Sequence, residues 1–359
     1  MALTITDDAS YLLKPINAVF QQTFLRRAQQ VCPYMTGTVP GMISKQQGTS
    51  TIKWRRVEQL AASTSALSEL TGAYTLMGGR SAATPSITDV LATLSKYGQF
   101  YIVNEEVDLY NPNGTTGELI ATLGESAGRS LNQLMATTTE GSLTQGYASN
   151  VASKAAVVNT VKTGDLNYVI NKLARNSART FTGMTAGAIE QTTAPILPSY
   201  WGLCHPDVAV DLSQLTGFTS VEKYAQQVSI AVGEFGYYSL AGRGVRFIMS
   251  EDALIGAGAG ASSTAVRNTT SVADVYAVPI YGQDCLGSVG LGMKHTDGIF
   301  KAGDNTGGWE IINHPLGSAG AGDPFNEIST LAYKFFFSSA VLNSNWGLSI
   351  RCAASLLVA

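Results

Sequence analysis

Residues 115–138 read TTGELIATLGESAGRSLNQLMATT, and this stretch supports two incompatible interpretations. As a motif, residues 124–128 (GESAG) fit G-x-S-x-G, the nucleophile elbow of serine esterases. As a pattern, the stretch predicts a helix, because apolar residues recur at steps of three and four. The predicted buried face of this helix consists of Ile120, Leu123, Ala127, Leu131, Leu134 and Met135.

The helix explains the stretch better than the elbow does. Ser126 falls among the charged residues on the polar side of the helix. A turn signal at 111–114 (NPNG), followed by a capping box of Thr115 and Glu118, starts the helix before the supposed elbow. An esterase of this type also needs an oxyanion loop before its serine, commonly with HGGG, and here the first histidine is His205. We therefore expect a spine helix without a catalytic residue, and keep the esterase only as a distant alternative.

The composition indicates a large folded chain with a neutral surface. Of its 359 residues, 45% are hydrophobic and 14% are charged, so a large core is available. Much of the surface must then be small and neutral, which suits close packing against copies of the same chain. Residues 1–60 hold seven Lys and Arg against three acids, whereas the whole chain has a net charge of −3. This basic segment is either a nucleic-acid contact or a solvated face, and the sequence leaves both alternatives open.

The cysteines and the chain start carry no sign of a metal site, a disulfide framework or export. Cys32, Cys204, Cys285 and Cys352 lie far apart without C-x-x-C spacing, so we expect buried, reduced thiols. We expect no metal and no cofactor. The first ten residues lack the apolar segment of a signal peptide, and no run of 18 apolar residues is present. We expect an uncleaved N-terminus, no membrane partner, and a protein made in a cytoplasm.

Two glycine-rich stretches are expected to be loops. Residues 256–261 (GAGAGA) fit the dinucleotide pattern G-x-G-x-x-A, with Asp274 at the distance of a ribose contact. Three polar residues at 250–252 separate these glycines from the nearest expected strand, and low complexity continues after them. A flexible surface loop is therefore the preferred interpretation, and the same holds for residues 317–322 (GSAGAG).

The chain before the spine helix predicts a projecting hairpin. After an expected helix at 12–31, residues 51–57 predict a strand and residues 87–107 a long return strand, with a low-complexity tip at 61–86. Strands of about 18 residues reach roughly 60 Å at 3.3 Å each. A two-stranded arm of that length is marginally stable alone, so we expect it to pack on a neighbouring subunit, the alternative being a hairpin folded back on its own body. The candidate contact residues are Trp54, Arg55, Arg56, Tyr97 and Phe100.

The chain after the spine helix predicts an α+β body without a regular βαβ repeat. The expected helices and strands are a helix at 166–178, a helix at 221–229, strands at 244–249 and 275–281, and a C-terminal block at 331–357.

Short stretches spread along the chain add to this order of elements. They are TIKWRR at 51–56, EQL at 58–60, LATLSKYG at 91–98, LGE at 123–125, AG at 127–128, HPDV at 205–208, DL at 211–212, GEFG at 233–236, VRFI at 245–248, GQD at 282–284, DP at 323–324, Lys334, LN at 342–343 and Arg351. With these stretches, the order of elements resembles the major capsid proteins of tailed phages with the Hong Kong 97 fold, and more closely the family typified by coliphage N4. The stretches cover the chain from about residue 51 to 351, and their order and spacing are more specific than any one of them.

The resemblance implies a division of the chain and a function. The implied parts are an N-terminal arm (1–50), an E-loop β-hairpin (51–110), a peripheral domain with the spine helix (111–200), a mainly axial domain (201–322) and a C-terminal return to the peripheral domain (323–359). The implied function is a shell of hexamers and pentamers around double-stranded DNA, held by non-specific contact, in a virion assembled in the host cytoplasm. Scaffold, portal and decoration proteins are the implied partners. A cellular encapsulin-type nanocompartment of the same fold is the alternative.

Overall fold

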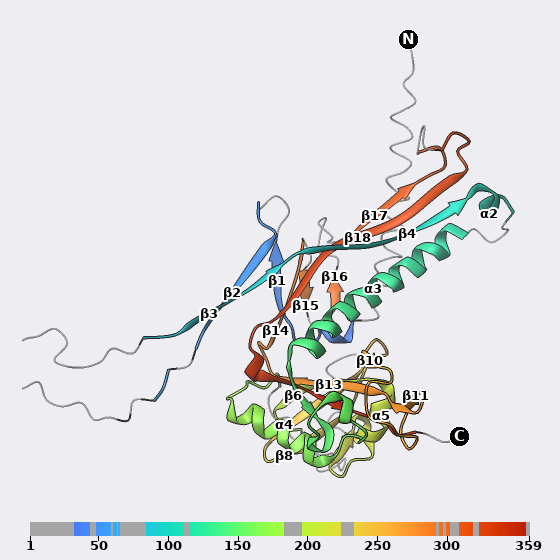
Figure 1. Cartoon of the computed structure of the whole chain (residues 1–359). Helices are drawn as coiled ribbons and strands as arrows, with labels where there is room; N and C mark the ends of the chain where they lie inside the picture. The colour runs from blue at the N-terminus through green and yellow to red at the C-terminus, as the bar shows by residue number, and fades with distance from the viewer. Residues whose placement is uncertain are drawn as a thin grey trace, which may run out of the picture.

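The computed structural model describes residues 32–43, 48–58, 60–62, 64, 84–110, 115–182, 196–223, 233–291, 294–296, 299–301, 309–318 and 323–356. The expected helix at 12–31 and most of the expected hairpin tip lie outside these residues. Of the expected helix at 221–229, the described part is a 3-10 turn, Val221–Lys223. The described chain forms an elongated layer and a globular domain, and the long helix α3 runs from one to the other (Figure 1).

Helix α3 spans Thr115–Ser142, 28 residues, or roughly 42 Å at 1.5 Å per residue. Its apolar stripe is the buried side. Ile120, Leu123, Ala127 and Leu131 are at most 1% exposed, and Leu134 is partly buried against the same cluster. The period of three and four therefore identified both the helix and the face that it buries.

The helix continues one turn beyond residue 138. Threonine has a low helix propensity, but the hydroxyls of Thr138 and Thr139 bond to the backbone carbonyls four residues back. The Thr138 hydroxyl also lies 2.6 Å from that of Ser339, and Glu140 is buried. Contacts with the rest of the protein thus extend the helix where local propensity is weak.

The elongated layer is built on one long strand, β18 (Ile328–Val341). The sheet order is β1 (Val39–Ile43), β14 (Leu286–Leu291), β18 and β17 (Trp309–His314), with β4 (Ser95–Asn104) also paired to β18. Alternate residues of β18, namely Leu331, Tyr333, Phe335 and Phe337, are buried in the cluster that contains the α3 stripe. The opposite face of this sheet is not covered by α3.

The predicted hairpin is shorter than the sequence suggested. Strand β2 (Thr51–Val57) pairs in antiparallel register with β3 (Ile87–Thr93), seven residues each, or roughly 23 Å. The expected return strand at 87–107 is interrupted at Leu94, whose N–H donates to the carbonyl of Ser50. The chain then continues as β4, which leaves the ribbon to pair with β18, and as helix α2 (Glu105–Tyr110). Alternation alone predicted extended chain but could not reveal that its two halves have different partners.

The globular domain contains an eight-stranded sheet. The sheet order is β5 (Thr144–Tyr147), β19 (Gly347–Cys352), β13 (Val275–Tyr281), β6 (Ser199–Cys204), β9 (Arg243–Met249), β8 (Glu234–Leu240) and β7 (Phe218–Ser220), with β10 (Ile255–Gly256) on β13. Helices α4 (Thr163–Arg175) and α5 (Pro206–Ser213) pack with one face of the sheet. The opposite face of the sheet packs in the same cluster as α3. Trp201 and Leu203 of β6 are among its residues.

Short elements complete the described chain. These are the strand pairs β11 (Asn268–Thr269) with β12 (Val272–Ala273) and β15 (Lys294–Thr296) with β16 (Ile299–Lys301), and the 3-10 turns Pro33–Met35, Ala148–Asn150, Lys154–Ala156 and Ser344–Trp346.

The elongated layer and the globular domain are built from interleaved parts of the chain. Helix α4 packs in the globular domain. Strands β14 and β17 pair in the elongated layer, and strand β19 joins the eight-stranded sheet. The chain crosses between the two bodies several times, because each sheet recruits strands that are distant in sequence.

The α3 stripe provides a direct test of this packing. We expect Leu131→Ala to lower the free energy of unfolding by about 2–5 kcal/mol, because the side chain is fully buried and truncation leaves a cavity. Urea unfolding of the unassembled protein measures the change. The exposed Gln133 of the same helix provides the control, since Gln133→Ala should change stability by less than about 0.5 kcal/mol. Equal effects of the two substitutions would contradict the assigned faces.

Candidate functional site

The G-x-S-x-G sequence does not form a nucleophile elbow. Ser126 lies within α3, after eleven helical residues, whereas an elbow places the serine at a turn between strand and helix. Its hydroxyl donates a hydrogen bond to Oε1 of Gln99 on β4 at 2.6 Å. Ser126 thus ties the helix to the elongated sheet.

The glycine-rich stretch at 256–261 is held by its own chain. The N–H of Gly258 donates to Oδ1 of Asp274 at 2.7 Å, and the N–H of Gly260 donates to the carbonyl of Ala273 at 2.9 Å. The carboxylate that the sequence placed at the distance of a ribose contact therefore closes this loop. Where we expected a flexible loop, these hydrogen bonds fix the turn at two points.

The cysteines behave as small apolar residues. All four are buried thiols, as the sequence predicted. Burial raises the pKa of Cys32 and of Cys285 to about 12, so both are protonated at neutral pH. Within the described ranges, no three His, Cys, Asp or Glu side chains are grouped as metal ligands. No helix among the described residues is both long and apolar enough to cross a membrane.

The β2–β3 ribbon has an inner face that packs on its own chain. Ile52, Trp54 and Ala92 form a small cluster with Ile43 of β1 and Val289 of β14. This cluster anchors the base of the ribbon to the elongated layer.

The outer face of the ribbon is exposed and mixes apolar with charged residues. Val57 lies opposite Ile87 in the antiparallel register, and these two side chains and Leu91 are among the exposed large hydrophobic residues. Asp89 pairs with Lys53 and Arg55 at 2.5 and 3.0 Å. These two cations hold the pKa of the Asp89 carboxyl below its usual range. We call these six residues the ribbon face: Lys53, Arg55, Val57, Ile87, Asp89 and Leu91.

The five side chains predicted to contact a neighbour differ in their surroundings. Trp54 lies on the inner face of the ribbon. Arg56 donates to a backbone carbonyl just after β18 at 2.6 Å, and the ring of Tyr97 lies 5.6 Å from a phenylalanine ring of β18. These three therefore pack on their own chain. Arg55 and Phe100 are exposed, with Phe100 at 62%, and remain available for a neighbour.

The side of the elongated sheet that faces away from α3 carries a second set of apolar residues, some exposed and some partly buried. The register places Phe100 of β4 opposite Ala332 of β18, which in turn lies opposite Ile312 of β17. One step along, Ile102 lies opposite Thr330 and is 58% exposed. We call this row of five residues the sheet face: Phe100, Ile102, Ile312, Thr330 and Ala332.

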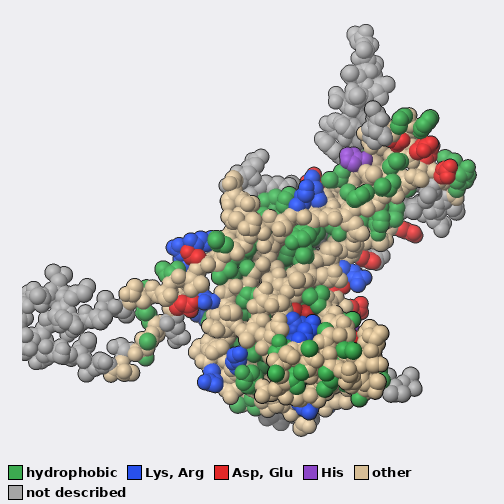
Figure 2. Space-filling model, in the orientation of Figure 1, with side chains coloured by type: hydrophobic (Ala, Val, Ile, Leu, Met, Phe, Trp, Pro, Cys, Tyr) green, Lys and Arg blue, Asp and Glu red, His purple; other side chains and the backbone are tan. Residues whose placement is uncertain are grey.

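Further exposed apolar residues gather at the far end of the elongated layer. Leu109 and Tyr110 of α2 and Phe325 before β18 are more than two-thirds exposed. Figure 2 shows apolar side chains at this end, interspersed with acidic ones.

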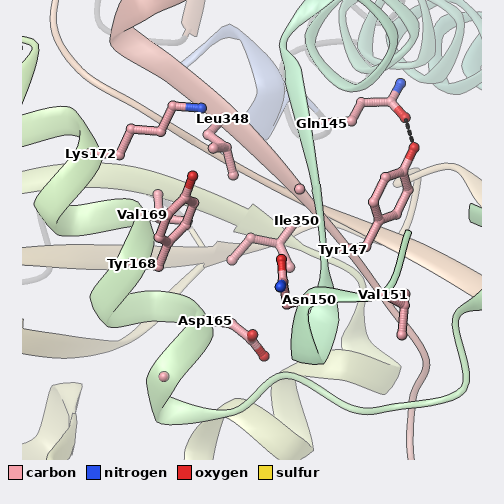
Figure 3. A pocket seen from close by; sticks show the side chains of 12 residues that line it. Gln145, Tyr147, Asn150, Val151, Asp165, Tyr168, Val169, Lys172, Leu348 and Ile350 are labelled. Carbon is pink, nitrogen blue, oxygen red and sulfur yellow. Dashed lines mark hydrogen bonds between the residues drawn. The ribbon is translucent and has the colours of Figure 1, made fainter. Parts of the chain in front are cut away.

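A cavity of about 430 Å³ lies between α4 and β5 (Figure 3). Leu348 and Ile350 of β19 form its apolar floor, and Tyr168 and Lys172 of α4 lie on one wall. The Asp165 carboxylate in this wall already accepts two backbone N–H groups. The charged side chains of this cavity are therefore one amine and one carboxylate.

A buried polar cluster joins α3 to the globular domain. The side-chain amide of Asn132 donates to Ser250 and Asp252 at 3.1 Å and accepts the N–H of Tyr34 at 3.0 Å. Arg129 of α3 also pairs with Asp252 at 2.9 Å. One face of the helix is thus bonded to the turn after β9 and to the segment before β1.

A second buried polar cluster lies at the last turn of α3. We call the two clusters together the polar joint. Oε1 of Glu140 accepts the hydroxyl of Tyr34 at 2.6 Å and the N–H of Leu254 at 3.3 Å. Its other oxygen lies 3.8 Å from Nη1 of Arg351 on β19, and Nη2 of Arg351 donates to the Glu140 carbonyl at 2.5 Å. Burial raises the pKa of Glu140 to about 7, against the opposing effect of these hydrogen bonds and of Arg351.

Sequence reasoning missed this joint. Asn132 and Glu140 are almost completely buried, yet periodicity assigns only apolar residues to the core. The available signal was Asn132 itself, which directly follows the buried Leu131 and interrupts the apolar pattern. Asp252, the partner of Asn132, and Arg351, the partner of Glu140, are each more than a hundred residues away, so no local pattern connects them.

No known protein-family pattern matches this chain, and no curated protein sequence matches it. Solved structures do match it over almost its whole length. The capsid protein of Ralstonia phage GP4 aligns with a TM-score of 0.58 at 9% identity, covering 92% of this chain and 93% of that one. The acid-stable capsid of Helicobacter pylori bacteriophage KHP30 gives 0.57 at 9% identity, with 90% and 91% covered. Cyanophage Pam1 capsid gives 0.56 at 9% identity, with 92% of each chain covered.

These comparisons establish the fold. The chain has the mixed α+β fold of phage capsid proteins, which confirms the fold predicted from the sequence. With 8–11% identity to the neighbours, the likeness concerns the arrangement of elements rather than individual side chains.

The joint predicts a pH dependence of stability. Because the pKa of Glu140 rises to about 7 on folding, the folded chain holds a proton between about pH 4.5 and 7 that the unfolded chain releases. The contribution of Glu140 to the free energy of unfolding is therefore largest below about pH 4.5. It falls by at most about 3 kcal/mol as the pH rises to 7. Glu140→Gln, which stays neutral and keeps an acceptor oxygen for Tyr34, should flatten this decline.

Urea unfolding of the unassembled protein at pH 5 and pH 7.5 measures the effect. Glu118→Gln, at an exposed position of the same helix, is the matched control and should keep the wild-type pH dependence. The assignment fails if Glu140→Gln and wild type lose the same stability between the two pH values.

Proposed function

We propose that this chain is a major capsid protein that assembles into the icosahedral head shell of a tailed phage (Caudoviricetes) and encloses double-stranded DNA. The observation that carries the proposal is a fold shared with phage capsid proteins over about nine-tenths of both chains. The exposed apolar rows on the ribbon and on the elongated sheet agree with it, because such surfaces are typical of protein contacts.

In this proposal the β2–β3 ribbon is the base of the E-loop and lies over an adjacent subunit. The elongated layer is the peripheral domain, and the globular domain is the axial domain near the centre of each hexamer or pentamer. We assign the sheet face of the neighbour as the surface that receives the ribbon face. Both are apolar rows beside a salt bridge, formed by Asp89 on the ribbon and by Glu310 with Lys334 on the sheet at 3.1 Å. Each contact is modest, and the shell sums many of them.

The proposal also implies which molecules the shell binds and where it assembles. Packaged duplex DNA is held by non-specific contact, and a portal, a scaffold and decoration proteins are further partners of the shell. The shell assembles in the host cytoplasm and becomes part of the virion. An encapsulin-type nanocompartment would share the fold but enclose protein.

Electron microscopy of the protein expressed alone and from its native source tests the shell. Closed particles of tens of nanometres are expected, and nucleic acid inside native particles separates the capsid from the nanocompartment. A stable monomer or dimer from both sources would overturn the proposal.

Two substitutions on the ribbon test the assigned contact. Ile87→Asp with Leu91→Asp should abolish closed particles, because each places a charge on a surface that the neighbour covers and desolvates. Both side chains are more than half exposed in the single chain, so the stability of the unassembled protein should change by less than about 1 kcal/mol. Sedimentation velocity measures assembly, and thermal unfolding measures stability.

Ile255→Asp is the control for this pair. Ile255 is a partly exposed isoleucine on β10 of the globular domain, outside both apolar rows. Its substitution should leave particle formation intact. Normal particles from the doubly substituted ribbon would refute the assigned contact while leaving the fold unaffected.

A further inference from the structure

A second cleft lies at the C-terminal end of α4. It has a volume of about 620 Å³ and is bounded by the end of α4, the turn between β8 and β9, and the turn after β13. Its charged side chains are Arg179 and Arg243, and Ser177, Thr180 and Gln283 add polar groups to its walls. Unlike the cavity beside β5, it has no carboxylate in its lining.

The end of α4 is shaped by a tight turn that brings Arg179 to this cleft. The N–H of Ser177 donates to the carbonyl of Ala174, and the N–H of Ala178 donates to that of Leu173, both at 3.0 Å. With Ser177 in the left-handed region at φ 54°, this is a Schellman motif, which ends the helix abruptly. The chain therefore leaves α4 at a fixed position, and Arg179 directly follows the motif.

Both arginines are held by their own chain from one side. Nη1 of Arg243 donates to the hydroxyl of Tyr200 at 2.6 Å and to the carbonyl of Ala178 at 3.4 Å. The guanidinium of Arg179 lies 5.9 Å from the ring centre of Trp346, and its Nη1 is 3.8 Å from Asp284, beyond hydrogen-bond length. A guanidinium has five N–H donors, so each arginine retains donors for a ligand in the cleft.

The surroundings of the cleft are positive although the whole chain has a net charge of −3. Lys172 and Arg175 lie in the last turn of α4, where cations also complement the helix dipole. Figure 2 shows Lys and Arg side chains on the side of the globular domain where Figure 1 places α4. Of these cations, Arg179 and Arg243 line the cleft itself, Lys172 lines the cavity beside β5, and Asp284 is the carboxylate paired with Arg179.

We infer that this cleft binds a phosphate group. Planar guanidinium groups match phosphate oxygens in bidentate geometry, and hydroxyl and amide groups in the walls supply further hydrogen bonds. The inference rests on the proposed function for the source of the phosphate, which in a filled shell is the backbone of the enclosed duplex DNA. Free phosphate or pyrophosphate has the same chemistry and is the other source.

Fluorescence anisotropy of a labelled 20-base-pair duplex, titrated with unassembled protein at several salt concentrations, tests the site. A plot of log affinity against log salt has a negative slope, and each lost phosphate contact reduces the magnitude of this slope by about one. Arg179→Gln with Arg243→Gln should therefore lower it by about two, and Arg179→Gln alone, at an exposed position, by about one. Replacing both arginines by Lys should keep the slope. Pyrophosphate should displace the duplex from wild type.

Lys96→Gln with Lys223→Gln removes the same charge at two exposed positions elsewhere and should leave the slope unchanged. An equal loss in this control would overturn the site, as would arginine variants that keep both duplex and pyrophosphate binding, or displacement of the duplex by polyglutamate as effectively as by pyrophosphate. If the arginine variants lose pyrophosphate binding but keep duplex binding, the phosphate source is the free anion.

Electron microscopy of the same proteins separates this site from the shell function. Wild-type protein that binds the duplex through these arginines but forms no particles would contradict the shell and leave the site standing. Wild-type particles whose duplex and pyrophosphate affinities are both independent of Arg179 and Arg243 would contradict the site and leave the shell standing.

Discussion

Burial of one apolar face of α3 holds the two bodies of this protein together. Along the elongated layer the face packs on alternate residues of β18, and towards the C-terminal end the same cluster includes β6 and β9 of the eight-stranded sheet. Burying a leucine or isoleucine fully contributes about 1.5–3 kcal/mol, and the stripe provides several. Neither sheet can turn away from the other without uncovering this face, so α3 sets their relative position.

The polar joint adds direction to this apolar contact. Hydrophobic packing is non-directional, whereas the amide of Asn132 satisfies partners from two segments at once. Glu140 and Arg351 do the same at the end of the helix, at the cost of a carboxyl whose pKa is raised by burial. A buried, connected polar network of this kind is costly if any member moves, and it therefore selects one arrangement of helix and sheet.

Among the described residues, α3 packs on one side of the elongated layer, and the other side carries exposed Phe100 and Ile102. The sheet face, the ribbon face and the apolar far end would be a poor surface for a solitary protein. Under the proposed function, the same surfaces become contacts between copies of the chain. A chain with few charges would then suit repeated packing. The packing of Trp54 and Tyr97 on their own chain shows that aromatic residues near a projecting ribbon also serve to anchor it.

The sequence by itself determined the local elements: the spine helix and its buried face, strands β2, β9 and β13, the buried thiols, and an α+β fold recognised by the order of short matches. These depend on periodicity and side-chain type, which neighbours in sequence define. Only the tertiary structure decided that residues 87–107 divide between two sheets, that α4 belongs to the globular domain, that Asn132 meets Asp252, and that Arg179 and Arg243 line one cleft. These pairings join residues up to a hundred and more positions apart. They arise because each sheet must pair its backbone hydrogen bonds and cover its apolar face with whatever strand fits, a requirement that no local pattern records.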